Sequence, residues 1–149
     1  MDLSYNQVTG EFTNENSEVI AKGWAGHGVG KNAPEHQMDH ELGPLPQGVY
    51  AIGPWGDWST QNYPKHLGPL IASLTQVEGE SYGRDGFFIH GPGGPDPLQS
   101  SKGCIEVYRI DREHVAMVTR GPGDRLKVVG PVVTANPTVD ITPDEGGAD

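Results

Sequence analysis

Apolar residues along the chain fall in short runs, and each run is bounded by turn-forming residues such as glycine, proline, asparagine and aspartate. Runs of this length predict β-strands rather than helices. The hairpin signal is clearest at Thr9-Gly10, which separates two short apolar segments. The pattern therefore favours a mainly β fold with many tight turns. The expected strands are residues 3–8, 11–13, 19–24, 49–52, 71–77, 87–90, 101–107 and 126–129.

One segment, Arg112–Thr119, has the pattern of a helix instead. It places Val115 and Val118 on one face, and Asp111 before it is a suitable N-cap. Gly121 follows and ends the periodic pattern. We therefore expect one short helix in the C-terminal part of the chain.

Three stretches rich in glycine, proline and polar residues are expected to be loops, namely residues 26–43, 53–66 and 91–99. A loop as long as residues 26–43 in a compact domain usually carries function or is mobile. The C-terminal end, residues 131–149, holds four acidic residues and no Lys or Arg, which predicts a disordered tail. We expect one domain over residues 1–133 and an acidic tail over residues 134–149.

The charge of the chain excludes several classes of function. Ten Lys and Arg stand against 20 Asp and Glu, a formal net charge of −10. A surface of this sign repels phosphate backbones, so we expect no nucleic-acid partner. No apolar run approaches the length of about 18 residues that a membrane span needs. The first 20 residues hold no Lys or Arg, so we expect synthesis in the cytoplasm without a secretory signal peptide.

Two clusters resemble ligand sites, but each lacks a required part. The loop at 26–32 resembles a phosphate loop, which needs glycine where Ala25 stands and Ser or Thr where Asn32 stands. His36 and His40 suit zinc only on a helix, and the glycines and proline around them disfavour a helix there. A solvated polar loop is the favoured interpretation. We expect neither a metal nor another cofactor.

The single cysteine, Cys104, is the candidate nucleophile. It follows two small residues, Ser101 and Gly103, and His90 lies 14 positions upstream at the end of a buried strand. A thiol reacts as the thiolate, so it needs a neighbouring base, and a loop of this length can bring His90 to it. The small residues let a substrate carbonyl approach, and the N–H groups of Gly103 and Cys104 are candidates for an oxyanion hole. A free cysteine that is only a buried apolar residue is the alternative.

These residues resemble the active-site signature of L,D-transpeptidases, in which His-Gly is followed by Ser-X-Gly-Cys. Here the signature is His90-Gly91 and Ser101-Lys102-Gly103-Cys104. Further segments narrow the resemblance to the type VI secretion L,D-transpeptidase effector family, from about residue 3 to residue 129. These segments are residues 4–10, 22–26, 30–34, 43–50 and 83–87.

The resemblance implies an L,D-transpeptidase-like β-sandwich or open barrel, with one short helix after the catalytic cysteine. It also implies a cysteine acyl-transfer enzyme that acts on peptidoglycan stem peptides. Cys104 would attack the carbonyl that joins the diamino acid of the stem to its terminal D-alanine. His90 would be the base, oriented by the backbone carbonyl of Gly91. Water as acceptor gives a carboxypeptidase, whereas an amine gives transpeptidation or exchange.

The chain departs from many housekeeping L,D-transpeptidases at two positions. Lys102 stands where they carry His, and Glu106 stands where they carry Arg. Arg84 or Arg109 could supply the missing positive charge for a substrate carboxylate. We count Lys102 and Tyr63 with them as candidate substrate-binding residues.

The resemblance also implies partners and a place of action. An effector of this family would act in the periplasm of a target cell, delivered by secretion machinery and neutralised by a cognate immunity protein. Two alternatives stay open from the sequence. One is a phage-borne or housekeeping wall enzyme with the same chemistry, and the other is a non-catalytic wall-binding module.

Overall fold

The computed structural model describes residues 1–92 and 101–132, and the expected acidic tail and most of the expected loop at 91–99 lie outside these residues. The fold consists mainly of short strands with one longer helix. The strands are β1 (Leu3–Asn6), β2 (Glu11–Thr13), β3 (Val19–Ala25), β4 (Gly48–Ile52), β5 (Ala72–Glu78), β6 (Phe87–His90), β7 (Ile105–Val107) and β8 (Arg125–Val129). The helices are α1 (Trp58–Gln61), α2 (Arg109–Val118) and the 3-10 turns η1 (Gly28–Gly30), η2 (Pro34–His36) and η3 (Lys65–Leu67).

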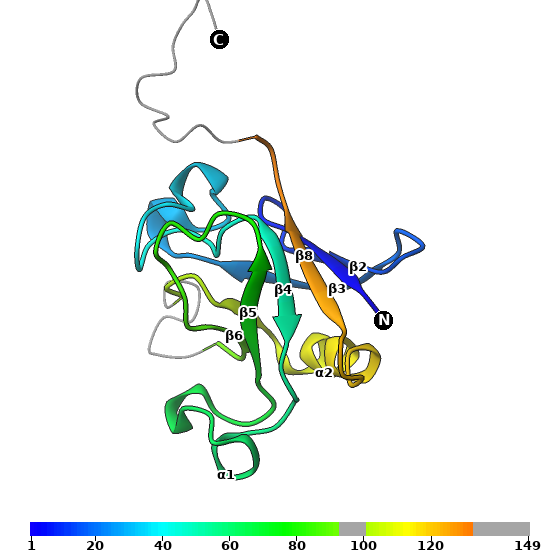
Figure 1. Cartoon of the computed structure of the whole chain (residues 1–149). Coiled ribbons are helices and arrows are strands. Elements are labelled where there is room, and N and C mark those ends of the chain that lie inside the picture. Colours follow the sequence, from blue (N-terminus) through cyan, green and yellow to red (C-terminus); the bar gives the residue numbers. More distant parts are fainter. Residues whose placement is uncertain (93–100, 133–149) are drawn as a thin grey trace, which may run out of the picture.

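The strands close into a barrel in the order β1-β2-β3-β7-β6-β5-β4-β8. Figure 1 shows β4 beside β5 and β8, its two partners in this barrel. Most neighbours are antiparallel, but β1 pairs with β8 and β6 pairs with β7 in parallel. Closure leaves no unpaired sheet edge among the strands of residues 1–92 and 101–132. The mainly β class that the sequence predicts is confirmed, and the barrel is closed rather than open.

The barrel core is built from alternate residues of the strands, because successive side chains of a strand point to opposite faces. Aromatic rings fill much of it, and the rings of Tyr5 and Phe12 lie 5.0 Å apart between centroids. The residues that form this core include Leu3, Tyr5, Phe12, Tyr50, Leu74, Phe87, Ile89, Ile105, Val107, Leu126 and Val128.

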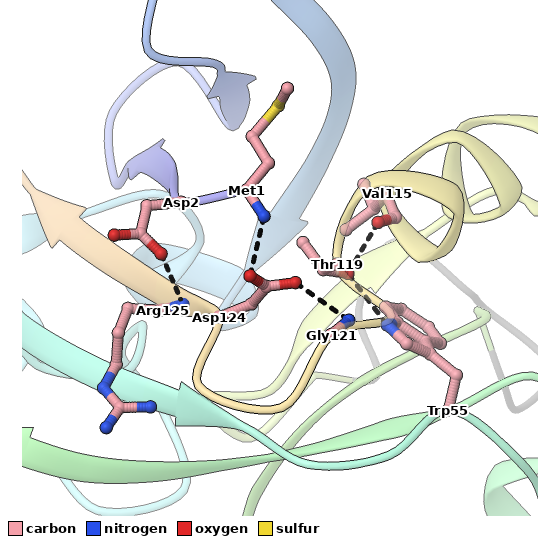
Figure 2. A network of polar contacts seen from close by, with 8 residues as sticks. All are labelled: Met1, Asp2, Trp55, Val115, Thr119, Gly121, Asp124 and Arg125. Atoms are coloured by element: carbon pink, nitrogen blue, oxygen red, sulfur yellow. Dashed lines mark hydrogen bonds and ion pairs between the residues drawn. The ribbon is translucent and has the colours of Figure 1, made fainter.

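Polar contacts fix the place where β1 meets β8 (Figure 2). The amino group of Met1 donates to Asp124 Oδ1 at 2.6 Å, and the other oxygen of Asp124 accepts from Gly121 N at 3.1 Å. Asp2 Oδ1 accepts from Arg125 N at 3.0 Å. These contacts tie the start of β1 to the turn that leads into β8, where the barrel closes.

The helix α2 begins earlier than the sequence predicts. It starts at Arg109, three positions before the expected start, and its N-cap residue Tyr108 makes no side-chain capping bond. Asp111, the expected cap, lies inside the helix, and its Oδ2 accepts from Lys22 N of β3 at 3.0 Å. The expected N-cap is therefore wrong, because Asp111 attaches α2 to β3, against which the helix packs.

The C-terminal end of α2 is tied to the loop after β4 (Figure 2). Thr119 Oγ1 donates to Val115 O at 2.6 Å and accepts from Trp55 Nε1 at 2.9 Å. Both ends of the helix are thus attached to the barrel, which holds its first turn beside β7.

Other boundaries differ from expectation where polar side chains bond to the main chain. The first strand ends at Asn6, whose Oδ1 accepts from Val8 N and Thr9 N. The expected loop at 53–66 contains α1, whose first turn is capped by Asp57. The expected strand over 101–107 begins only at Ile105. Among the described residues, no helix is both long and apolar enough to cross a membrane.

Candidate active site

The strands β6 and β7 bring the candidate nucleophile and base to one face of the barrel wall. Their parallel register pairs Ile89 with Ile105 and His90 with Glu106. Ile89 and Ile105 belong to the core, so the alternation of side chains places His90 and Glu106 on the outer face. Cys104 lies one position before Ile105 and shares that face.

A groove with a volume of about 1130 Å³ runs over this face. It brings together many of the expected site residues, namely His90, Gly91, Cys104, Arg84, Lys102 and Arg109. Among the described residues, Ser101, Gly103 and Tyr63 are expected site residues that do not line it. The groove is also lined by Glu106, Arg112, His66, Glu41 and Asp85.

His90 is buried at the end of β6 with one fixed hydrogen bond. Its Nδ1 lies 2.6 Å from the carbonyl oxygen of Gly91. A carbonyl only accepts, so Nδ1 carries the proton and Nε2 of the neutral ring is left as the basic nitrogen. Burial lowers the pKa of His90, the Gly91 carbonyl opposes this, and the charges of Arg112 and His66 lower the pKa further. The imidazole is therefore held neutral, with Nε2 as its proton acceptor.

The thiol of Cys104 is half-buried and also neutral. Sγ accepts from Phe88 N at 3.3 Å and lies 3.9 Å from Gly86 O, so its partners among the described residues are main-chain groups of β6 and the turn before it. Burial raises the pKa of Cys104 to about 11, and the charge of Glu106 acts in the same direction. The N–H of Phe88 and the charge of Arg84 act against it. The resting pair is thus a thiol and a neutral imidazole.

The turn before Cys104 is held by Ser101, which is almost fully buried. Ser101 Oγ donates to Cys104 O at 2.6 Å and accepts from Gly26 N at 2.9 Å and from Gly103 N at 3.2 Å. The N–H of Gly103 is thus directed at Ser101 and not at the groove, which differs from its expected place in an oxyanion hole. A Cβ at Gly103 would lie 2.6 Å from Arg84 Nη2, and the φ of +123° also requires glycine.

Arg84 is buried with its donors directed at main-chain carbonyls. Nη1 donates to Gln37 O at 2.6 Å and to Pro44 O at 2.8 Å. Nη2 donates to Gly43 O at 3.0 Å and to Lys102 O at 3.2 Å. The guanidinium therefore connects the loop at 37–44 to the turn that carries Cys104.

Lys102 and Arg109 are the exposed cations of the groove. Lys102 Nζ lies 3.8 Å from Glu41 Oε1, and Arg109 Nε donates to Glu113 Oε2 at 2.9 Å. Exposed pairs of this kind contribute little free energy, about 0–1 kcal/mol. Both cations can therefore turn to a ligand at small cost.

Tyr63 does not line the groove but packs against Phe88, which does. Its OH donates to Pro54 O at 2.7 Å, and its ring meets the ring of Phe88 edge-on at 5.6 Å between centroids. Phe88 in turn lines the groove and donates its N–H to Cys104. Tyr63 thus reaches the site through Phe88.

Two buried groove residues, Arg112 and Glu106, are not among the site residues that the sequence predicts. The sequence places Arg112 at the start of a helix and shows Glu106 as a departure from a family pattern. Both are buried, Arg112 with 5% and Glu106 with 0% of its surface exposed. Strand alternation could have found Glu106, since it lies two positions after Cys104. No signal along the chain could have found Arg112, because its place depends on how α2 packs.

The other histidines do not form a metal site with acidic neighbours. His36 Nδ1 lies 2.6 Å from Asp39 Oδ2, and His40 Nε2 lies 3.0 Å from Tyr82 O. Within residues 1–92 and 101–132, no group of three or more His, Cys, Asp or Glu is placed to hold a metal ion.

The family of the chain follows from a comparison with known families. The model of the Tlde1 domain matches residues 19–130. The chain therefore belongs to this family, the type VI secretion L,D-transpeptidase effectors, whose fold is L,D-transpeptidase-like. The chain matches none of the curated proteins.

The fold is similar to two solved structures of one protein. The helical cell shape determining protein Pgp2 from Campylobacter jejuni has a TM-score of 0.51 and 17% identity, over 85% of this chain and 46% of that chain. A mutant of Pgp2 gives a TM-score of 0.50 and 17% identity, over 85% and 45%. The chain thus spans less than half the length of these Pgp2 chains. At this identity the likeness shows the fold alone.

Proposed function

We propose that this protein is a cysteine acyl-transfer enzyme that cleaves the bond between the diamino acid and the terminal D-alanine of peptidoglycan tetrapeptide stems. One observation carries the proposal. Cys104 and His90 line the same groove, and the contact between His90 Nδ1 and Gly91 O leaves Nε2 as a base. Neither residue needs an acidic third member for this arrangement.

The first step starts from a neutral pair, because the pKa of Cys104 is raised and that of His90 is lowered. The Cys104 side chain turns from Gly86 O toward His90 Nε2. His90 takes the thiol proton as Sγ attacks the stem carbonyl, and a tetrahedral adduct forms. The bond to D-alanine then breaks, and His90 returns the proton to the leaving amine. The products are free D-alanine and a thioester on Cys104.

The oxyanion of the adduct needs hydrogen-bond donors at the turn before β7. We assign the backbone N–H of Cys104 as the first donor, because the Gly103 N–H is directed at Ser101 Oγ in the resting structure. Gly103 joins as a second donor when that bond opens. One such donor is worth roughly 10²–10³-fold in rate.

The second step depends on the acceptor that enters the groove. His90 Nε2 takes a proton from water or from an amine, and the acceptor attacks the thioester. Water gives a tripeptide stem, which is L,D-carboxypeptidase activity. The amine of a D-amino acid or of a second stem gives exchange or transpeptidation.

We assign the binding of substrate carboxylates mainly to Lys102 and Arg109, since both are exposed and weakly paired. Arg84 lines the groove too, but its donors are directed at carbonyl oxygens. We therefore assign Arg84 a structural role, in which it holds the turn before Cys104 and places a positive charge near the thiol. Tyr63 acts through the position of Phe88.

In the cell we propose an antibacterial effector that secretion machinery delivers to the periplasm of a target cell, with a cognate immunity protein in the producing cell. Family membership supports this role. A phage-borne or housekeeping wall enzyme would use the same chemistry, and the presence of an immunity gene beside this gene distinguishes the two.

The test is to incubate the purified protein with tetrapeptide muropeptides and to analyse the products by mass spectrometry. We expect loss of D-alanine from tetrapeptides, and incorporation of a labelled D-amino acid when one is added in excess. Pentapeptide and tripeptide muropeptides serve as controls and should stay unchanged. Unaltered tetrapeptide at high protein concentration would overturn the proposal and favour a wall-binding module.

A further inference from the structure

A second buried arginine, Arg112, lies beside the base and is held like Arg84 by main-chain carbonyls. Nη1 donates to Val107 O at 2.7 Å and Nε donates to Leu70 O at 2.8 Å. Nη2 reaches Pro69 O at 3.4 Å. The guanidinium thus joins the end of β7 to the segment before β5, and only 5% of the residue is exposed.

The same guanidinium lies directly against Gly91. A Cβ built on Gly91 would lie 2.6 Å from Nη1 and 3.2 Å from Cζ of Arg112. Glycine is therefore the residue that lets the two groups approach, and no positive φ is involved. The carbonyl of this glycine is the group that accepts from His90 Nδ1. Arg112 is in contact with the peptide that orients the imidazole.

We propose that Arg112 is a positioning residue for His90, which fixes the Gly91 peptide and thereby holds the imidazole in the Nδ1–H tautomer, with Nε2 as its basic nitrogen. This inference rests on the proposed function, in which His90 is the base. The hydrogen bonds of Arg112 are made to main-chain carbonyls and not to the imidazole. Arg112 therefore acts on His90 through its contact with Gly91 and through its charge.

The charge of Arg112 changes the pKa of His90 in one direction. A cation near an imidazole disfavours the imidazolium, so Arg112 lowers the pKa of His90, in the same direction as the larger effect of burial. His66 of η3 faces His90 and acts the same way. Two further titratable groups lie near His90, namely Glu106 of β7, which is opposite His90 in the register, and Cys104, which lines the same groove. Both residues are kept in every variant below, so their effect on the His90 pKa is common to all of them.

The experiment is an NMR titration of His90 in wild type and in Arg112→Gln. Imidazole ¹⁵N shifts report the tautomer, and the His90 signals are assigned by their loss in His90→Ala. We expect wild type to show the Nδ1–H tautomer and a His90 pKa below that of a free histidine. In Arg112→Gln we expect the pKa of His90 to rise and the tautomer to become mixed. The activity should fall within the roughly 10²–10⁴-fold range that a positioned base supplies.

Two matched variants separate positioning from general damage. Arg84→Gln removes an equally buried guanidinium with the same kind of carbonyl partners. Arg84 is not among the groups that shift the pKa of His90, so that pKa should stay unchanged. Arg112→Lys keeps the charge and loses the fork of donors. In Arg112→Lys we expect the His90 pKa to return close to the wild-type value, because the charge is kept. The tautomer should stay mixed, because the donors that fix the Gly91 peptide are lost.

A folded Arg112→Gln protein with wild-type tautomer and wild-type His90 pKa overturns the inference. If this variant does not fold, Gly91→Ala decides instead, because its Cβ pushes Nη1 away while Arg112 stays in the chain. There we expect the same rise of the His90 pKa, and an unchanged titration overturns the inference. The NMR readout needs no substrate, so failure of the proposed function would appear separately as a wild-type protein without turnover.

Discussion

Cys104 and His90 are both held in their neutral forms by burial, which raises the pKa of the thiol to about 11 and lowers that of the imidazole. An ion pair formed in advance, as in proteases with strongly acidic thiols, would need shifts in the opposite directions. The proposed chemistry at the residue scale is therefore general-base catalysis, with proton transfer during the attack.

Alkylation of the protein by iodoacetamide tests directly whether the resting thiol is neutral, since Cys104 is the one cysteine of the chain. The reactive form is the thiolate, so the alkylation rate should rise with pH through a midpoint of about 11. The rate is followed by intact-protein mass spectrometry, with Cys104→Ala as the unlabelled control. A midpoint at or below the ordinary thiol value of about 8.5 would contradict a neutral resting pair.

The two residues should behave as one unit in a double-mutant experiment. We expect His90→Ala to lose nearly as much activity as Cys104→Ala, and the double variant to be little worse than either. The reason is that the base has no role without the thiol whose proton it takes. Rates of D-alanine release from the four proteins measure this, and fully additive losses would show that His90 is not the partner of Cys104.

The sequence singles out these two residues because each lies in a short motif with a chemical reason for its composition, and both line one groove in the structure. It could not predict where the guanidinium donors of Arg84 and Arg112 are directed. Their positions depend on which main-chain carbonyls the fold leaves buried, such as Pro44 and Val107, and no local pattern records this. Arg84 was therefore expected to be a substrate ligand, whereas its donors are used within the fold.

At the scale of elements, the parallel register of β6 and β7 and the turn held by Ser101 place the site. Strand positions could be predicted well from alternation, because a one-residue shift would expose a whole core face. The start of α2 could not, since Tyr108 gives no capping signal and Asp111 bonds to β3 instead. The contacts that close the barrel could not be predicted either, because they join residues 123 positions apart, Met1 with Asp124 and Asp2 with Arg125.

Ser101→Ala tests the role of the turn. The change leaves Gly26 N, Gly103 N and Cys104 O without the hydroxyl partner that they share. Buried groups left unsatisfied cost about 1–3 kcal/mol, so we expect a loss of this size in the free energy of unfolding and a lower rate of D-alanine release.

Urea unfolding measures the stability of Ser101→Ala, with Ser59→Ala as the control because Ser59 lies on the exposed helix α1. The control should stay within about 0.5 kcal/mol of wild type. Equal stability of the two variants would mean that the Ser101 hydroxyl does not hold the turn.

At the scale of the whole molecule, the proposed function requires that the groove on the outer wall of the barrel meet a substrate outside the cytoplasm. The proposed substrate is found in the periplasm of a Gram-negative cell. We expect production in the cytoplasm to be harmless, and a fusion to a secretory signal to be toxic with swelling or division defects. Growth curves and microscopy of the producing cells measure this.

The secreted Cys104→Ala protein is the control for stress caused by secretion itself, and it should be harmless. Toxicity from the cytoplasm, or equal toxicity of the secreted variant, points to a target other than the wall. An immunity protein expressed in the periplasm should remove the toxicity of the secreted wild type.

The proposed function depends most on Cys104 as the nucleophile of an acyl transfer, and D-alanine release from tetrapeptide muropeptides by wild type and Cys104→Ala measures this most directly. We expect release by wild type and none above background by the variant, with nearly equal melting temperatures, because Cys104 is only half-buried. A folded Cys104→Ala protein that releases D-alanine at a rate close to wild type would contradict it.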